Sequence, residues 1–284
     1  MQSPVDQIIE RVTGSAPVAK SPLGGGCIGD VYKVDLEKGP AIVAKAGDAG
    51  GGLRLEGDML RYLGGHTDVP VPDVLYCDDT LILMSFLPAA GALDDSGEIE
   101  AADVIASLHD LSNGCFGFAY DTVIGGLHQP NPESLNWLPF FAEHRLRYMA
   151  GQALTAGRLP GRVMTRLEKF SEHLDTWLTE PARPSLIHGD LWGGNVLAHG
   201  GALSGFIDPA LYFADAEIEL AFSTLFQTFS DRFYDRYRER RAIGPGFFQE
   251  RRDIYNLYPL LVHVRLFGGG YVGSVERTLA KFGY

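Results

Sequence analysis

Residues 186–197 read LIHGDLWGGNVL, and residues 206–209 read FIDP. In both places a short apolar stretch, typical of a buried strand, borders polar residues. The pattern therefore predicts that Asp190, Asn195 and Asp208 lie on loops between short strands. Since the two stretches are close in sequence, we expect the oxygen atoms of these three side chains to gather in one place.

The types and spacing of these residues suit phosphoryl transfer. That reaction needs a carboxylate to accept the proton of a hydroxyl group, and Mg²⁺ prefers hard oxygen ligands. We therefore predict Asp190 as the catalytic base and Asn195 and Asp208 as Mg²⁺ ligands.

The motif departs from that of protein kinases in two places. It reads HGDxxxxN where protein kinases have HRDxxxxN, and Asp208 is followed by Pro209 where they have Phe. Both differences favour a kinase that acts on a small substrate. His188 is expected to be structural.

A cluster of glycines lies near the start of the chain, in the spacing GxGxxG. On its own this spacing is weak evidence, because a dinucleotide site also needs a helix directly after it. Here a strand pattern follows, which is the context of a kinase glycine-rich loop whose backbone N–H groups cover phosphates. A simple surface turn remains the alternative. The predicted nucleotide-binding residues of this loop are Gly24, Gly25, Gly26, Cys27, Ile28 and Gly29.

Lys45 lies within the apolar strand pattern of residues 41–46. A lysine in such a strand must point to solvent or find a partner. In a kinase site it contacts phosphates and is held by a glutamate from the next helix, for which Glu56 is the candidate. The alternative is a lysine on an edge strand and a solvated glutamate.

The distribution of patterns predicts an α+β protein with two lobes. Residues 1–88 contain strand patterns and are expected to form an N-terminal nucleotide-binding lobe. Residues 89–284 are expected to form a larger, mainly helical catalytic lobe. Helices are predicted at 4–12, 53–63, 98–112, 160–179 and over most of 215–283, and strands at 32–36, 41–46, 73–77 and 80–87.

Composition narrows the function further. The formal net charge of −12 argues against nucleic-acid binding, which favours a basic balance. The three cysteines form no CxxC pair, so they indicate neither a zinc site nor a disulfide framework. The N-terminus lacks an apolar signal sequence and no apolar run is long enough to span a membrane, so we expect a cytoplasmic protein.

Taken together, these stretches resemble the fructosamine kinase (ketosamine-3-kinase) family, within the aminoglycoside-phosphotransferase and choline-kinase-like superfamily. Trp192 after HGDL and the Asp208-Pro209-Ala210 sequence distinguish this family from its neighbours. Gly193 stands where the family usually has Ser, and Glu219 where many relatives have Asp. Further matching stretches are 24–28, 55–58, 116–118, 122–129, 137, 140–146 and 188–196.

The resemblance implies a protein-kinase-like fold and ATP-dependent phosphorylation of the 3-hydroxyl of a ketosamine, a sugar joined to an amine by Amadori rearrangement. The 3-phosphate destabilises the adduct, so the activity would repair glycated molecules. By the same analogy Trp192 lies beside the sugar. The segment expected to meet adenine is Met84, Ser85, Phe86 and Leu87.

A ketosamine is largely cationic near neutral pH, so its site should offer carboxylates. Besides Asp190, we predict Asp215 and Glu217 as substrate-binding residues, with Glu219 as a further candidate. Two alternatives stay open: a kinase for an aminoglycoside, choline or homoserine, and a non-catalytic nucleotide-binding protein. The chain is expected to be a monomer, or a redox-linked dimer through Cys27 if that residue is reactive.

Overall fold

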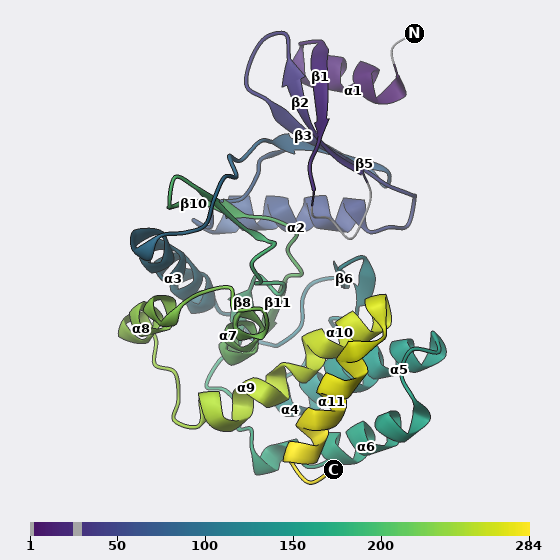
Figure 1. The fold of residues 1–284 in the computed structure, drawn as a ribbon, viewed down its shortest axis with the longest axis vertical. Helices are drawn as coiled ribbons and strands as arrows, with labels where there is room; N and C mark the ends of the chain where they lie inside the picture. Colours follow the sequence, from purple (N-terminus) through teal and green to yellow (C-terminus); the bar gives the residue numbers. More distant parts are fainter. Residues whose placement is uncertain (1–2, 25–29) are drawn as a thin grey trace.

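A computed structural model describes residues 3–24 and 30–284. The chain forms a small lobe built on a sheet and a larger, mainly helical lobe (Figure 1). This confirms the predicted α+β, two-lobed protein-kinase-like fold. The predicted loop residues Gly25 to Gly29, Cys27 among them, lie outside the described residues. None of the helices in the described part of the chain is both long and apolar enough to cross a membrane.

The N-terminal lobe is a five-stranded antiparallel sheet in the order β1-β2-β3-β5-β4. Its elements are α1 (Pro4–Thr13), β1 (Pro17–Pro22), β2 (Asp30–Leu36), β3 (Ile42–Ala46), α2 (Leu53–His66), β4 (Val74–Cys77) and β5 (Leu81–Ser85). The predicted lobe boundary at residue 88 lies in the segment that joins β5 to the first helix of the second lobe.

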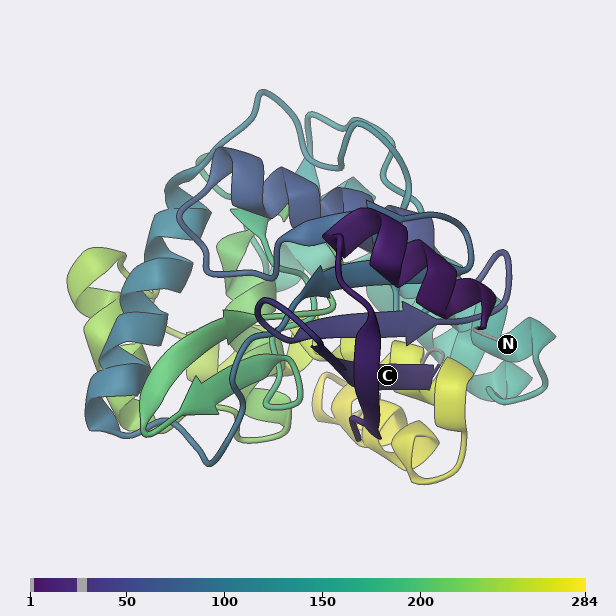
Figure 2. The ribbon, with the colours of Figure 1, turned by 90° about the horizontal axis from the view of Figure 1, so that it is seen from above.

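The two helices of the N-terminal lobe cover opposite faces of its sheet (Figure 2). Successive residues of a strand point to opposite faces, so Ile42 and Ala44 pack with Ile9 of α1. Val43, between them, packs with Leu53 and Leu60 of α2. Lys45 follows the same alternation and therefore points to the α2 side, towards the second lobe.

The C-terminal lobe begins with α3 (Asp95–Asp110) and is built on helices. The other helices are α4 (Trp137–Phe140), π-helix η1 (Phe141–Arg147), α5 (Tyr148–Thr155), α6 (Gly161–Ser171), 3₁₀-helix η2 (Leu174–Thr176), α7 (Ala216–Leu225), α8 (Asp231–Arg240), π-helix η3 (Phe247–Arg251), α9 (Arg252–Tyr255), α10 (Leu257–Phe267) and α11 (Gly270–Lys281). The strands are β6 (Thr122–Ile124), β7 (Leu127–Gln129), β8 (Ser185–Ile187), β9 (Val196–His199), β10 (Ala202–Phe206) and β11 (Tyr212–Ala214).

Two short antiparallel pairs position the predicted catalytic residues. Strand β8 pairs with β11, and β9 pairs with β10. Asp190 lies between β8 and β9, Asn195 immediately precedes β9, and Asp208 lies between β10 and β11. This confirms the prediction that all three lie on loops between short strands.

The β9–β10 hairpin is hydrogen-bonded to both sides of the lobe junction. Phe206 N–H donates to the carbonyl of Pro70, which belongs to the segment between α2 and β4 (2.8 Å). Ala90 N–H, in the segment between β5 and α3, donates to the carbonyl of Ala198 (2.7 Å). At the tip of the hairpin, the Gly201 carbonyl accepts from Asp94 N–H, the N-cap residue of α3 (2.8 Å).

The sequence located most elements but missed some. The predicted helices and strands of the first lobe all form, and residues 215–283 are mostly helical. The predicted helix at 160–179 ends at Ser171, followed by η2. Strand β1 was not expected, because Pro17 and Pro22 bound it and most of its side chains are exposed. The sequence likewise predicts no helix or strand in the irregular region that contains β6, β7 and η1.

Close packing of α3 on the hairpin tip gives a testable result. A Cβ at Gly97 would lie 2.2 Å from the Gly201 carbonyl oxygen, whereas a Cβ at Gly151 in α5 would meet nothing within 4 Å. Gly97→Ala should therefore lower the free energy of unfolding by about 1–3 kcal/mol, as overpacking does. Gly151→Ala should be neutral or stabilising by about 0.5–1 kcal/mol, because alanine favours a helix. Urea unfolding of the two variants tests this, and equal effects would contradict the packing argument.

Candidate active site

A cavity of about 320 Å³ lies between the two lobes. From the N-terminal lobe it takes Leu23, Gly24, Val31, Val43, Lys45 and Pro72, and from the end of β5 and the segment after it come Met84, Ser85, Phe86, Leu87 and Ala89. From the C-terminal lobe it takes Trp192, Gly194, Leu197, Ile207 and Asp208. The fold thus brings the predicted adenine segment, Lys45, Asp208 and Trp192 to one cavity.

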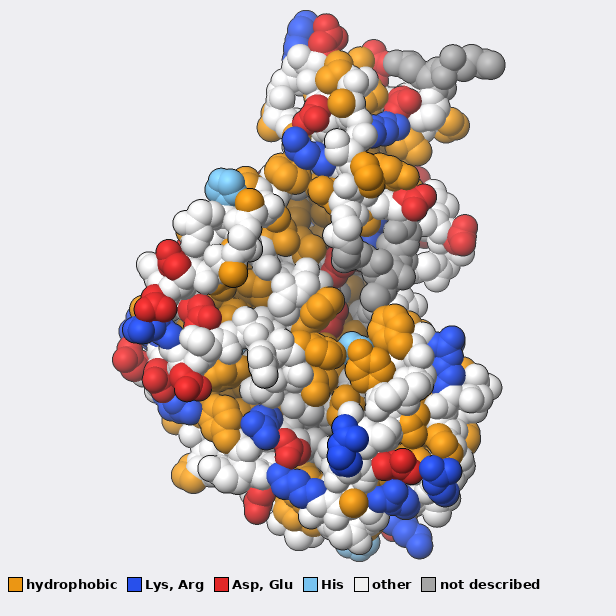
Figure 3. Space-filling model, in the orientation of Figure 1, with side chains coloured by type: hydrophobic (Ala, Val, Ile, Leu, Met, Phe, Trp, Pro, Cys, Tyr) orange, Lys and Arg blue, Asp and Glu red, His pale blue; other side chains and the backbone are white. Residues whose placement is uncertain are grey.

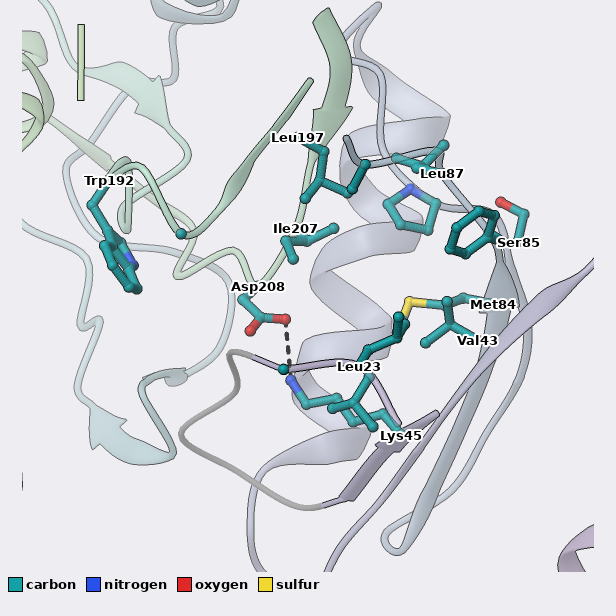
Figure 4. A pocket seen from close by; sticks show the side chains of 16 residues that line it. Leu23, Val43, Lys45, Met84, Ser85, Leu87, Trp192, Leu197, Ile207 and Asp208 are labelled. Carbon is teal, nitrogen blue, oxygen red and sulfur yellow. Dashed lines mark hydrogen bonds and ion pairs between the residues drawn. The ribbon is translucent and has the colours of Figure 1, made fainter. Parts of the chain in front are cut away.

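The cavity has two apolar walls and one charged end. Val43 and Met84 line one side and Leu197 and Ile207 the other, while Lys45 and Asp208 lie together at one end (Figure 4). An apolar space with walls on two sides suits a flat ring, and the charged groups beyond it suit a polar tail.

Lys45 forms the central contact of the site. Its Nζ lies 2.8 Å from Oε2 of Glu56 in α2 and 3.1 Å from Oδ1 of Asp208 in the other lobe. Lys45 and Glu56 are only 2% and 4% exposed. Burial alone would lower the pKa of Lys45, but the two carboxylates outweigh it and raise the pKa. The lysine therefore stays charged, and the alternative of an exposed edge lysine with a solvated glutamate is excluded.

Asp208 has an unusual backbone conformation. Its φ angle is +53°, in the left-handed region that residues other than glycine adopt rarely. Aspartate and asparagine tolerate this region better than most residues because their short polar side chains can hydrogen-bond locally. The turn directs the Asp208 carboxylate towards Lys45, whose Nζ donates to Oδ1 of Asp208. The second oxygen, Oδ2, takes no part in that contact.

Asp190 is held by Asn195 of the same loop. The Asn195 side-chain amide donates to Oδ2 of Asp190 (2.8 Å) and to its backbone carbonyl (2.9 Å). Oδ1 of Asp190 takes no part in these bonds. Asp190 is partly buried, and the loss of contact with water raises the pKa of its carboxyl group to about 7. A carboxylate of this kind is oriented and poised to accept a proton near neutral pH.

Glu219 lies beneath this loop and supports it. Its carboxylate accepts hydrogen bonds from the backbone N–H groups of His188 (3.1 Å) and Gly189 (2.6 Å). It also contacts Nε2 of His109 (2.8 Å). Burial acts to raise the pKa of Glu219, but the contacts with His109 and Gly189 lower it overall. Glu219 was considered above as a substrate ligand; that was wrong, because its side chain is fully buried.

The segment after Asp208 is fixed by a second polar network. Gln129 of β7 donates to the Ala210 carbonyl (3.1 Å), and Thr122 of β6 donates to the Leu211 carbonyl (3.2 Å). Tyr258 of α10 donates to the Gln129 side chain (2.6 Å). Sequence patterns did not reveal this network, since its members are far apart along the chain.

Trp192 lies at the edge of the cavity, half-buried. A Cβ at Gly194 would lie 2.4 Å from its ring, so the ring packs directly on that glycine. The neighbouring Gly193, where the resemblance suggested Ser, has nothing within 4 Å of a Cβ and could accommodate that side chain.

The carboxylates of Asp215 and Glu217 lie away from Trp192. Asp215 caps α7 and accepts from Tyr255 (2.6 Å), while Glu217 binds Arg251 through both oxygens (2.6 and 2.7 Å). Trp192 contacts Phe226, at the other end of α7. With a rise of about 1.5 Å per helical residue, the two ends are roughly 16 Å apart. The structure therefore does not bring these two predicted substrate residues to Trp192.

The donor set fits a single Mg²⁺ shared with a phosphate chain. Asp208 offers Oδ2 and Asn195 offers Oδ1, since the contacts above use the other atoms. Among the described residues no cluster of three or more His, Cys, Asp or Glu side chains could hold a metal ion alone. Mg²⁺ commonly completes its shell with water and substrate phosphates, so a two-residue site suits it.

The fold and the paired loops define a phosphotransferase of the kinase-like class, and the comparisons agree. The chain is 33% identical to a probable ketoamine kinase of Vibrio parahaemolyticus over 81% of this chain and 80% of that protein. It superposes on a crystal structure from Thermobifida fusca described as a fructosamine-3-kinase with a TM-score of 0.85 and 30% identity, covering 98% and 99% of the two chains. The aminoglycoside phosphotransferase APH(4)-Ia, solved with ADP and hygromycin B, shares the fold (TM-score 0.67, 17% identity, 99% of this chain and 100% of that one).

The sequence model of the fructosamine kinase family matches residues 1–282. The chain belongs to this family and is a kinase with an alcohol group as acceptor. The alternative of a non-catalytic protein is therefore set aside.

The raised pKa of Asp190 predicts a pH-dependent effect on stability. In the unfolded chain an aspartate has a pKa near 4, whereas the folded protein binds the Asp190 proton up to a pH of about 7. Between these two values the folded state binds more protons than the unfolded state, so the stability of the folded protein falls as the pH rises. Asp190→Asn removes this effect. The free energy of unfolding of the variant, relative to that of wild type, should rise by about 1–2 kcal/mol from pH 5 to pH 8. This figure is smaller than the full pKa shift would give, because Asp190 is partly exposed to solvent. Urea unfolding without nucleotide measures this, with Asp68→Asn as an exposed baseline; the same difference at both pH values would refute it.

Proposed function

We propose that the chain transfers the γ-phosphoryl group of ATP, with Mg²⁺, to the 3-hydroxyl of a ketosamine. The observation that carries the proposal is the contact of Lys45 with Asp208 at one end of the interlobe cavity. Nζ of Lys45 and Oδ1 of Asp208 belong to different lobes and lie 3.1 Å apart. It places the cation expected for phosphates beside a carboxylate expected for the metal ion, next to the loop that carries Asp190.

The nucleotide would lie along the cavity, with residues 1–88 supplying most of its contacts. Adenine would occupy the apolar space beside Met84 and Leu87, and Lys45 would meet the phosphates. Asn195 and Asp208 would hold Mg²⁺, which when bound neutralises charge on the phosphates. These roles rest on the cavity lining, the charge of Lys45 and the oxygens left by the contacts of Asn195 and Asp208.

Asp190 would act on the acceptor hydroxyl. Its Oδ1 accepts the hydroxyl proton as the substrate oxygen bonds to phosphorus and the bond to the ADP oxygen breaks. Asn195 keeps Oδ2 of Asp190 in a fixed orientation. A base with a raised pKa holds the transferred proton more readily than an ordinary aspartate.

The ketosamine assignment draws on the family and on the acceptor side of the site. Ketosamines carry an amine that is cationic near neutral pH, and Asp190 and the ring of Trp192 offer a carboxylate and an aromatic face for it. Asp215 and Glu217 have the partners described above, so we place the recognition of the cation on Asp190 and Trp192. Phosphorylation at the 3-hydroxyl would destabilise the adduct and free the amine, which is a deglycation activity.

A second candidate is a kinase for another small alcohol, since an aminoglycoside phosphotransferase shares the fold. A panel of ketosamines, an aminoglycoside, choline and homoserine, with ATP consumption measured, separates the two. Turnover confined to a substrate other than a ketosamine would favour the second candidate.

The assigned roles predict different effects at the two aspartates. Asp190→Asn should lower kcat by about 10²–10⁴-fold or more, because it removes the base, while the affinity for Mg·ATP stays nearly unchanged. Asp208→Asn preserves the left-handed backbone conformation but removes the negative charge with which Asp208 would hold Mg²⁺, so it should weaken Mg·ATP binding as well. Isothermal titration with a non-hydrolysable ATP analogue measures this, and similar nucleotide affinities for the two variants would refute the division of roles.

The site also predicts discrimination by charge. Ribulosyl-lysine should be a better substrate than free ribulose by about 10–150-fold in kcat/KM, the range expected for one hydrogen bond to a charged group. Trp192→Ala should lower kcat/KM for ribulosyl-lysine and leave the KM for ATP nearly unchanged. Equal kcat/KM for the two acceptors in the wild type would show that the amine is not recognised.

A further inference from the structure

Four side chains extend the aromatic face of Trp192 away from the cavity; we call them, together, the aromatic surface: Phe226, His263, Phe267 and Tyr271. Phe226 contacts Trp192, with ring centroids 5.9 Å apart. His263 of α10 lies 5.0 Å from Phe226, and the rings of Phe267 and Tyr271 lie 5.7 and 4.9 Å from His263. The rings therefore form one continuous contact chain that begins at the active site.

Much of this surface is open to solvent. Phe226 is 38% exposed and Phe267 is 55% exposed. In Figure 3, hydrophobic side chains gather over α10 and α11 where the C-terminal lobe borders the hollow between the lobes. Single exposed apolar side chains are common, but several in contact at the mouth of a site indicate a binding role.

The aromatic surface carries no carboxylate or ammonium group of its own. Burial lowers the pKa of His263, which keeps its ring neutral near pH 7. Nδ1 of His263 lies 2.7 Å from the Pro259 carbonyl, so this nitrogen is the donor and Nε2 remains an acceptor. An apolar group would lose little on binding here, whereas an anionic group would find no cationic partner among these side chains.

Position decides what this surface can bind. Trp192 lines the cavity on one side and contacts Phe226 on the other, so a substrate whose sugar meets Asp190 and Trp192 can extend along the rings. The part of a ketosamine that extends from the sugar is the substituent on its nitrogen.

We propose that the aromatic surface binds the nitrogen substituent of the substrate and favours apolar, especially aromatic, amines. This inference rests on the proposed ketosamine kinase function and adds a selectivity to it. The exposure of Phe267 leaves room for substituents larger than a single ring, and the lack of a cationic side chain among the four disfavours substituents with a negative charge at this point.

The experiment compares two acceptors that differ only in the substituent: the ribulose conjugates of 2-phenylethylamine and of methylamine. Wild type should show a kcat/KM about tenfold higher for the phenylethyl conjugate, as expected from burying one apolar ring face. In Phe267→Ala that ratio should fall several-fold. Leu135→Ala, which removes an 82% exposed leucine outside the aromatic surface, is the matched control and should keep the wild-type ratio.

The possible outcomes distinguish the proposed selectivity for apolar amines from the proposed ketosamine kinase function on which it rests. If wild type and Phe267→Ala each phosphorylate the two conjugates efficiently and with equal kcat/KM, the proposed selectivity is wrong. The ketosamine kinase function would still stand in that case. Phosphorylation of neither would overturn both. Sedimentation of wild type and Phe267→Ala provides a further check: a wild-type dimer that the substitution dissociates, with the substrate ratio unchanged, would assign the surface to a second copy of the chain and overturn the proposal.

Discussion

The contacts of Lys45 hold the site together. A charge buried this deeply is tolerated only with partners, because removing it from water costs several kcal/mol. Here the partners come from α2 and from the other lobe, through Glu56 and Asp208. The strand that places Lys45, the helix that places Glu56 and the hairpin that leads to Asp208 must therefore all fold correctly for this charge to be neutralised. Packing of the sheet against α2 and pairing of β9 with β10 both serve that one requirement.

The chemistry of the site was predictable where it is encoded locally. The spacing from Asp190 to Asn195 fits within one loop, and the apolar pairs on either side specify the short strands that hold it. Lys45 and Glu56 belong to adjacent elements, so strand alternation and helix position were enough to suggest the pair. The two-lobed fold followed from the same patterns, because strand patterns dominate the first lobe and helical ones the second.

The remaining parts could not be predicted because they depend on partners far apart in sequence. The sequence suggested Glu219 as a carboxylate for the cationic substrate, but His109, in another helix, and the backbone of the catalytic loop enclose it. Acidic residues after Asp208 suggested a cation site, yet a ten-residue helix separates them from Trp192. The aromatic surface is assembled from α7, α10 and α11, and no single stretch of sequence contains it. Buried polar networks and surfaces of this kind become visible only in the folded chain.

The attachments of the β9–β10 hairpin bear on how the two lobes can move. The hairpin belongs to the C-terminal lobe by sequence, yet its backbone is bonded to Pro70 on one side and to Ala90 on the other. A wide swing of one lobe would have to break the bond to Pro70 and separate Lys45 from Asp208 as well. A smaller opening of the cleft leaves these contacts in place and therefore costs less free energy. We expect the lobes to move relative to each other mainly by such small displacements. Such an enzyme would bind and release its ligands through small displacements of the lobes. A regulator that acts by separating the lobes widely would have to overcome all of these contacts.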